Sequence, residues 1–250
     1  MISEFTEFSY GFAVTHELIL QNSGNVVAAP EFPSLIREGQ AGGGYDVRLN
    51  FGTFLFLQFK LSEFMYGRRA RYRSLMGLPY YKFWITPRWQ SQQHRMLVDL
   101  GNAGQQVYYA APIFHLQTDF NTEFQGNTVV NRSAFINPVE IGYLADDDEH
   151  CIVFNNTEAH FCSQPQKVRL HTGGSLKEFV AAQMQVLNPT STLELASMLN
   201  RIIGSSDKRV PSFTERSIPL ALEYISFVAH VFLHSEVFFV PTAVEQSAGS

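Results

Sequence analysis

Three polar residues, Asp46, Gln58 and Lys60, lie in segments whose pattern otherwise predicts buried β-strands. Asp46 is near the start of the stretch YDVRLN, and Gln58 and Lys60 are near the end of the apolar stretch TFLFLQFKL. If the two stretches pair as a hairpin, the carboxylate and the amine converge at one edge of a sheet. A divalent cation there would offset the desolvation of these groups and hold a water molecule against a phosphodiester. The residue types therefore predict metal-assisted hydrolysis.

The surrounding pattern predicts the elements that must position these residues. Helical spacing or strand alternation indicates, in order, a helix at 5–20, strands at 45–50 and 53–61, a basic helix at 62–75, a helix at 90–100 and a strand at 107–114. An edge strand or extended connection, interrupted by two prolines, is expected at 26–36. The second of the two paired strands is apolar on both faces, which is typical of a central strand.

The motif in these strands resembles that of a known enzyme superfamily. GGGYDVRL (residues 42–49) and FLQFK (residues 56–60) are similar to the D…(D/E/Q)xK signature of the PD-(D/E)xK, or restriction-endonuclease-like, nucleases. The resemblance implies an α/β (α+β) fold with a restriction-endonuclease-like core, in which helices flank a mixed central sheet. It covers roughly residues 5–114, under half of the chain.

The resemblance also implies a metal site. Mg²⁺ or Mn²⁺ would be held by four groups, namely Asp46, the Gln58 amide oxygen, the Phe59 carbonyl and Glu17. Three further acidic residues are alternatives to Glu17: Glu4, Glu7 and Glu38. Lys60 would position or help to deprotonate the attacking water. Most members carry Asp or Glu where this chain has Gln58, and the loss of one negative charge favours a site with a single metal.

Charge is distributed unevenly along the chain. The net charge is −5, but the segment 60–95 holds eight Lys or Arg and one acid, which gives +7 there and −12 elsewhere. Cations alternate with tyrosine and tryptophan in this segment, as in surfaces that bind nucleic acid. The residues predicted to contact DNA are Arg68, Arg69, Arg71, Arg73, Lys82, Arg88, His94 and Arg95. We expect His94 on a helix surface or at a phosphate. The alternative is a solvated face that pairs with the acidic loop at 146–149.

The chain divides into three regions by pattern. We expect a core at 1–115, a β-rich extension of the same domain at 116–172 and a helical region at 173–250, with helices at 176–187, 191–203 and 217–234 and a short strand at 236–240. The helices are candidates for a homo-oligomeric or partner-protein interface. No signal-like segment or apolar run of membrane length is present, so a cytoplasmic protein without a membrane partner is expected.

Several functions fit these observations. The first is a metal-dependent endonuclease that hydrolyses DNA, which by family habit suggests an effector of bacterial defence against phage. The second is a catalytically silent module that binds nucleic acid or protein, with Asp46 and Lys60 as an ordinary ion pair. The third is an interaction protein whose helices form an oligomer. A zinc site is a further alternative, with ligands drawn from His150, Cys151, His160, Cys162 and His171. The glycines at 39–44 lack the spacing of a phosphate-binding P-loop.

Overall fold

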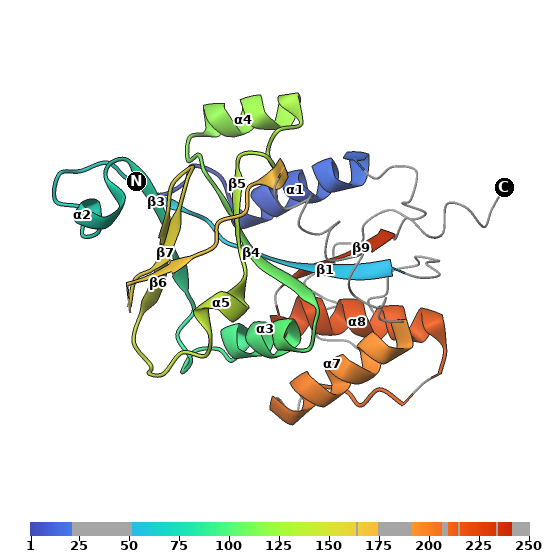
Figure 1. Ribbon diagram of the computed structural model, residues 1–250. Coiled ribbons are helices and arrows are strands. Elements are labelled where there is room, and N and C mark those ends of the chain that lie inside the picture. Colours follow the sequence, from blue (N-terminus) through green and yellow to red (C-terminus); the bar gives the residue numbers. More distant parts are fainter. Residues whose placement is uncertain are drawn as a thin grey trace.

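The computed structural model describes residues 1–21, 52–163, 165–174, 192–206, 210–214, 216–233 and 235–241 (Figure 1). Asp46, Glu38, the strands expected at 26–36 and 45–50 and the helix expected at 176–187 lie outside these ranges.

Helices and strands both occur throughout the described residues, which confirms the α+β class. The helices are α1 (Glu7–Gln21), α2 (Arg73–Met76), α3 (Gln93–Asn102), α4 (Gln117–Gly126), α5 (Pro138–Ile141), α7 (Thr192–Ser206) and α8 (Ile218–Leu233). The strands are β1 (Gly52–Phe59), β2 (Glu63–Met65), β3 (Tyr80–Ile85), β4 (Gln106–Pro112), β5 (Ser133–Ile136), β6 (His150–Phe154), β7 (Ala159–Phe161), β8 (Gln166–Val168) and β9 (Glu236–Pro241). None of the helices in the described ranges has the length and apolarity needed to cross a membrane.

A four-stranded mixed sheet forms the centre of the molecule, with the order β5-β4-β1-β9. β1 and β4 are parallel neighbours, and β9 and β5 add antiparallel strands on either side. Residues 55–57 of β1 thus pair with β4 on one side and with β9 on the other, so the predicted hairpin between 45–50 and 53–61 is wrong. Because parallel neighbours cannot be joined by a tight turn, the chain crosses over between β1 and β4, and α3 is the last element of that crossover. The carboxyl ends of β1 and β4 therefore lie at the same edge of the sheet.

Alternation along β1 directs its side chains into two different cores. Leu55, Leu57 and Phe59 pack on one face of the sheet with residues of α1 and α4. Phe56 packs on the other face with residues of α3, α7 and α8. Figure 1 shows α1 and α4 on one side of β1 and β4, and α3, α7 and α8 on the opposite side. The central strand is thus buried on both faces, as its apolar sequence predicts.

The second sheet is antiparallel, with the order β2-β3-β6-β7-β8. Its inner face, which includes Phe83 and Ile152, packs into the same core as α3. Its outer face carries Tyr80 and Val153 and is covered by Met76 and neighbouring residues of the α2 segment. The two sheets therefore share one core. α3 packs in this core together with α7 and α8.

The prediction of a helix at 62–75 is wrong. Residues Glu63–Met65 form β2, and only Arg73–Met76 is helical in this stretch. β2 pairs with β3 through the register Glu63↔Lys82, and the Phe64 ring stacks on His115 with 4.1 Å between ring centroids. These tertiary contacts outweigh the helix propensity of the arginine-rich segment.

Elements of the three expected regions are interleaved in space. β5, from the expected extension 116–172, joins β4, and β6, β7 and β8 extend the sheet that β2 and β3 begin. The extension also contains α4, which the pattern does not indicate. From the expected helical region, α7 and α8 pack against α3, and β9 pairs with β1.

Gly173 packs closely against the backbone of Val130, whose N–H is hydrogen-bonded to Glu17 of α1. A Cβ atom at Gly173 would lie 2.4 Å from the Val130 carbonyl oxygen, whereas a Cβ atom at Gly174 would meet nothing within 4 Å. We expect Gly173→Ala to lower the free energy of unfolding by about 1–3 kcal/mol, since backbone must move. Gly174→Ala is the matched control and should change it by less than about 0.5 kcal/mol. Urea unfolding of both variants measures this, and equal stabilities would contradict the close contact.

Candidate functional site

Gln58 is a buried polar residue on the central strand. Gln58 is 2% exposed, and it is paired with Tyr109 of β4 in the parallel register. Nε2 donates to the Phe59 carbonyl oxygen at 3.2 Å, while Oε1 has no hydrogen-bond partner among the described residues. An unsatisfied buried acceptor costs about 1–3 kcal/mol. Rotating the amide by half a turn would bring Oε1 towards the Phe59 carbonyl, so that two oxygens would meet where a cation could join them.

Lys60 follows β1 directly and remains attached to the sheet. Its backbone N–H donates to the Ala110 carbonyl at 2.9 Å, and its side chain is partly buried. Burial lowers the pKa of Lys60, and the carboxylate of Glu7 partly offsets this effect. Lys60 lies one residue beyond the end of β1, at the edge of the sheet, where the carboxylate of Glu7 of α1 reaches it. An amine with a lowered pKa at the edge of a sheet can exchange a proton more readily than an exposed lysine.

The glutamate of α1 that interacts with Lys60 is Glu7. Desolvation of its carboxylate raises the pKa of Glu7, while Lys60 and a hydrogen bond from the Leu61 backbone N–H lower it. The carboxylate thus lies at the point where the chain leaves β1. The sequence does not distinguish Glu7 from the other acidic alternatives, and the structure brings it to Lys60.

Glu17 lies elsewhere. It is 1% exposed, and its carboxylate accepts hydrogen bonds from the Val130 backbone N–H at 2.9 Å and from Gln21 Nε2 at 2.8 Å. Val130 belongs to the core on the α1 side of the sheet, whereas Gln58 faces the α3 side. The structure therefore does not bring Glu17 together with Gln58. Glu4 accepts from the Gln117 backbone N–H at 2.9 Å.

The described residues contain no group of three or more His, Cys, Asp or Glu side chains that could hold a metal ion. Asp46 and Glu38 lie outside those residues. Among the alternative zinc ligands, Cys151 and Cys162 are both buried free thiols. His150 and His160 instead contact the carboxylates of Asp146 and Glu158.

His94 is buried, not on the helix surface where the sequence places it. It is 4% exposed, its Nε2 is 2.8 Å from the Gly142 carbonyl and its Nδ1 is 2.8 Å from the Tyr109 hydroxyl. A carbonyl can only accept, so Nε2–H donates to Gly142 and Nδ1 accepts from Tyr109. Burial lowers the pKa of His94 to about 4, so the ring is neutral at physiological pH. It joins α3 to β4 next to Gln58.

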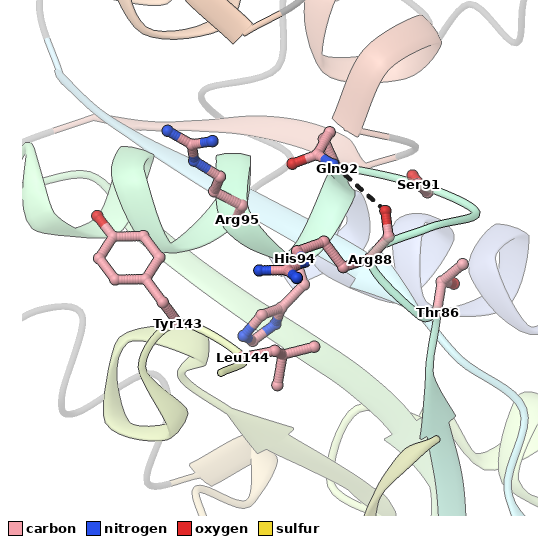
Figure 2. A pocket seen from close by; sticks show the side chains of 8 residues that line it. All are labelled: Thr86, Arg88, Ser91, Gln92, His94, Arg95, Tyr143 and Leu144. Atoms are coloured by element: carbon pink, nitrogen blue, oxygen red, sulfur yellow. Dashed lines mark hydrogen bonds between the residues drawn. The ribbon is translucent and has the colours of Figure 1, made fainter. Parts of the chain in front are cut away.

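A pocket of about 420 Å³ opens at the start of α3 (Figure 2). We call it the α3 pocket, and its polar lining consists of Thr86, Arg88, Ser91, Gln92, His94, Arg95 and Tyr143, with Leu144 beside them. The structure thus brings together three residues that the sequence assigned to DNA contact. Tyr143 and Leu144 had no signal in the sequence, because they come from a segment about forty residues beyond the end of α3.

The remaining predicted DNA contacts form a separate basic surface, defined as Arg68, Arg69, Arg71, Arg73 and Lys82. The four arginines are exposed, and the Arg71 guanidinium lies 5.4 Å from the ring centre of Tyr72. Lys82 Nζ is 3.2 Å from Glu63 Oε2 and 4.3 Å from the ring centre of Trp84.

The cysteine pair lies near two members of this basic surface. The pKa of Cys151 is lowered to about 7, first by a hydrogen bond from Cys162 and further by Tyr72, Lys82 and Arg71. Arg71 and Lys82 therefore both lie near one thiol on the outer face of the second sheet.

One contact fits the alternative interpretation of the basic segment. Arg88 Nε lies 2.8 Å from Asp147 Oδ1, so the acidic loop at 146–149 does pair with a residue of that segment. Both side chains are about half exposed, and such pairs contribute little to stability. Arg95 Nε lies 3.9 Å from Asp99 Oδ2 within α3.

The geometry defines an α+β protein with a polar site at the carboxyl edge of two parallel strands. Comparison with protein-family models, with curated proteins and with solved structures found no match. The function is therefore argued from the residues at this edge.

The pKa of His94 gives a prediction about stability and pH. An unfolded histidine titrates near 6.5 and the folded one near 4, so the unfolded state binds more protons between these values. Stability from this residue is present above pH 6.5 and is lost as the pH falls towards 4, by about 3 kcal/mol at most. We expect the free energy of unfolding, measured with urea at several pH values between 4 and 7, to rise less steeply with pH in His94→Gln than in the parent protein. Equal slopes would contradict a buried neutral histidine.

Proposed function

We propose that the protein is a divalent-metal-dependent phosphodiesterase that acts on DNA, with its centre at Gln58 and Lys60. The observation that carries the proposal is the unpartnered Oε1 of Gln58, buried two residues before a lysine with a lowered pKa. Such a pair is unfavourable in a purely structural strand, because an apolar residue would avoid the cost of burial. A ligand that meets the amide oxygen would offset that cost.

The donor set suits Mg²⁺ or Mn²⁺. The Gln58 amide oxygen and the Phe59 carbonyl would hold the ion together with the carboxylate of Asp46, and these hard oxygen donors are the ones such ions prefer. A bound ion would polarise the phosphodiester and lower the pKa of a water ligand. Lys60 would orient the attacking water and offset the negative charge that develops on the phosphate. One ion fits better than two, because Gln58 supplies no charge.

Glu7 replaces Glu17 as the helix glutamate of this proposal. The carboxylate of Glu7 interacts with Lys60, whereas that of Glu17 is already bound to Val130 and Gln21. Glu7 would keep Lys60 charged until a proton moves.

The arrangement of elements is compatible with a restriction-endonuclease-like core. The family order is a helix, a strand, the strand with Asp, the strand that ends in x-Lys, a helix and a further strand; here α1, β1, α3 and β4 follow the order of the helix, the x-Lys strand, the second helix and the last strand. The residues expected to form the first two strands lie outside the described ranges, and β9 is the antiparallel neighbour of β1. In this chain β2, α2 and β3 are inserted between β1 and α3. The correspondence supports the proposal by analogy of fold.

Cleavage by single-residue variants tests this proposal. Plasmid and single-stranded DNA are incubated with the full chain and Mg²⁺ or Mn²⁺. We expect Asp46→Ala and Lys60→Ala to lose at least about 100-fold in rate, since each removes a charge that acts in the transition state. Lys167→Ala is the matched control, because this exposed lysine lies on β8 and its replacement should leave the rate unchanged.

The outcomes separate the candidate functions. Equal cutting by the parent, Asp46→Ala and Lys60→Ala would sink the proposal. A Gln58→Glu variant should keep or increase cutting, since it adds a negative ligand for the ion. A parent protein that binds DNA but never cuts it, with or without Gln58→Glu, would favour a silent binding module.

The basic surface gives a separate prediction about DNA binding. Replacing Arg68, Arg69, Arg71 and Arg73 together by Gln should weaken binding and reduce the slope of log affinity against log salt by about one for each phosphate that is no longer neutralised. The charge-matched control replaces four exposed cations elsewhere, namely Lys167, Arg169, Arg201 and Arg216. Fluorescence anisotropy of labelled DNA at several salt concentrations measures both. The same slope for both variants would mean that the loop at 66–73 does not touch DNA.

A further inference from the structure

The α3 pocket combines two arginines with a described lining that carries no acidic side chain. Its eight described lining residues include two arginines, Arg88 and Arg95, and the ring of Tyr143. Three more, Thr86, Ser91 and Gln92, have neutral side chains that can form hydrogen bonds. Figure 2 shows that these residues come from three segments: the end of β3 and its following loop, the first turn of α3, and the segment after α5. A cavity of about 420 Å³ is within the range that small organic ligands occupy.

Each of the two arginines lies near one carboxylate, in a hydrogen bond of 2.8 Å for Arg88 and at 3.9 Å for Arg95. Arg88 meets Asp147, and Arg95 meets Asp99, in both cases through Nε. The two terminal nitrogens of each guanidinium are the donors that suit the oxygens of a phosphate group. The Arg88–Asp147 pair is about half exposed, so displacement of Asp147 by a phosphate costs little. The Asp99 side chain is 22% exposed and also accepts a hydrogen bond from the Tyr143 hydroxyl at 2.5 Å, so it holds Tyr143 as well as Arg95.

The rest of the lining is suited to a flat, less polar group. The exposed ring of Tyr143 and the side chain of Leu144 form the part of the wall away from Thr86 (Figure 2). Ser91 and Gln92 add hydrogen-bonding groups to the same lining. The floor is His94, both of whose ring nitrogens are bound within the protein, so this ring is fixed in place.

We propose that the α3 pocket binds a nucleoside monophosphate, with the phosphate between Arg88 and Arg95 and the base against Tyr143. Inorganic phosphate would fill only part of the cavity. Because His94 joins the pocket to Tyr109, which neighbours Gln58 on the sheet, an occupied pocket is connected to the proposed catalytic edge by two side chains. The binding proposal does not depend on the phosphodiesterase proposal.

The test measures binding by titration calorimetry without divalent metal, so that no cleavage is involved. Adenosine 5′-monophosphate, adenosine and inorganic phosphate are each titrated into the full chain. We expect the monophosphate to bind at least tenfold more tightly than either adenosine or phosphate. The variant Arg88→Gln/Arg95→Gln should weaken the monophosphate at least tenfold, and Tyr143→Ala should weaken it while leaving phosphate binding unchanged.

The control removes equal charge elsewhere, through Arg201→Gln/Arg216→Gln, and should leave all affinities as in the parent. Arg95→Gln alone, whose parent side chain is 59% exposed, gives a second variant that should also weaken the monophosphate if the double variant does not fold. The proposal is overturned if the monophosphate binds no better than inorganic phosphate, or if the arginine variants bind it like the parent. It is also overturned if an oligonucleotide without a terminal phosphate requires Arg88 and Arg95 while the monophosphate does not bind.

Discussion

The parallel pairing of β1 with β4 is the constraint on which the rest of the structure depends. Parallel neighbours require a long crossover, and in this chain the crossover contains β2, α2, β3 and α3. It returns the start of α3 to the edge where β1 and β4 end. Gln58 is thereby set beside Tyr109, and His94 is bonded to the hydroxyl of Tyr109. Ligand sites of open α/β sheets commonly lie at such edges, because loops converge there while the strands stay rigid.

The sequence predicts the elements whose periodicity is strong. The helices expected at 5–20, 90–100, 191–203 and 217–234 are confirmed as α1, α3, α7 and α8, and the strands expected at 53–61, 107–114 and 236–240 as β1, β4 and β9. α4 was missed because it is mostly polar and only Phe120 in it is buried, so its pattern carries little periodicity. The helix expected at 62–75 is wrong because strand pairing is a long-range interaction that local propensity does not reveal.

The candidate site was predictable where its residues share one strand. Gln58 and Lys60 are two positions apart, so the strand that holds Gln58 also brings Lys60 to the same edge of the sheet. Glu7 and Glu17 both lie on α1. Which of them reaches Lys60 depends on where α1 packs along the length of the sheet, and the sequence does not determine that position. The α3 pocket was not predictable, because it is assembled from three segments that only the crossover brings together. His94 was expected at the surface because its neighbours Gln92 and Arg95 are polar, yet it faces inward towards Tyr109.

β9 has a consequence for how the chain is made. It covers the free edge of β1, and the paired residues Leu57 and Glu236 are about 180 positions apart. During synthesis β1 leaves the ribosome long before β9 exists. Until then one side of the central strand exposes a row of unpaired backbone groups, which other chains can pair with. A strand made late in synthesis thus covers this edge of β1, so a nascent chain that stalls before β9 is a candidate for aggregation and for capture by chaperones.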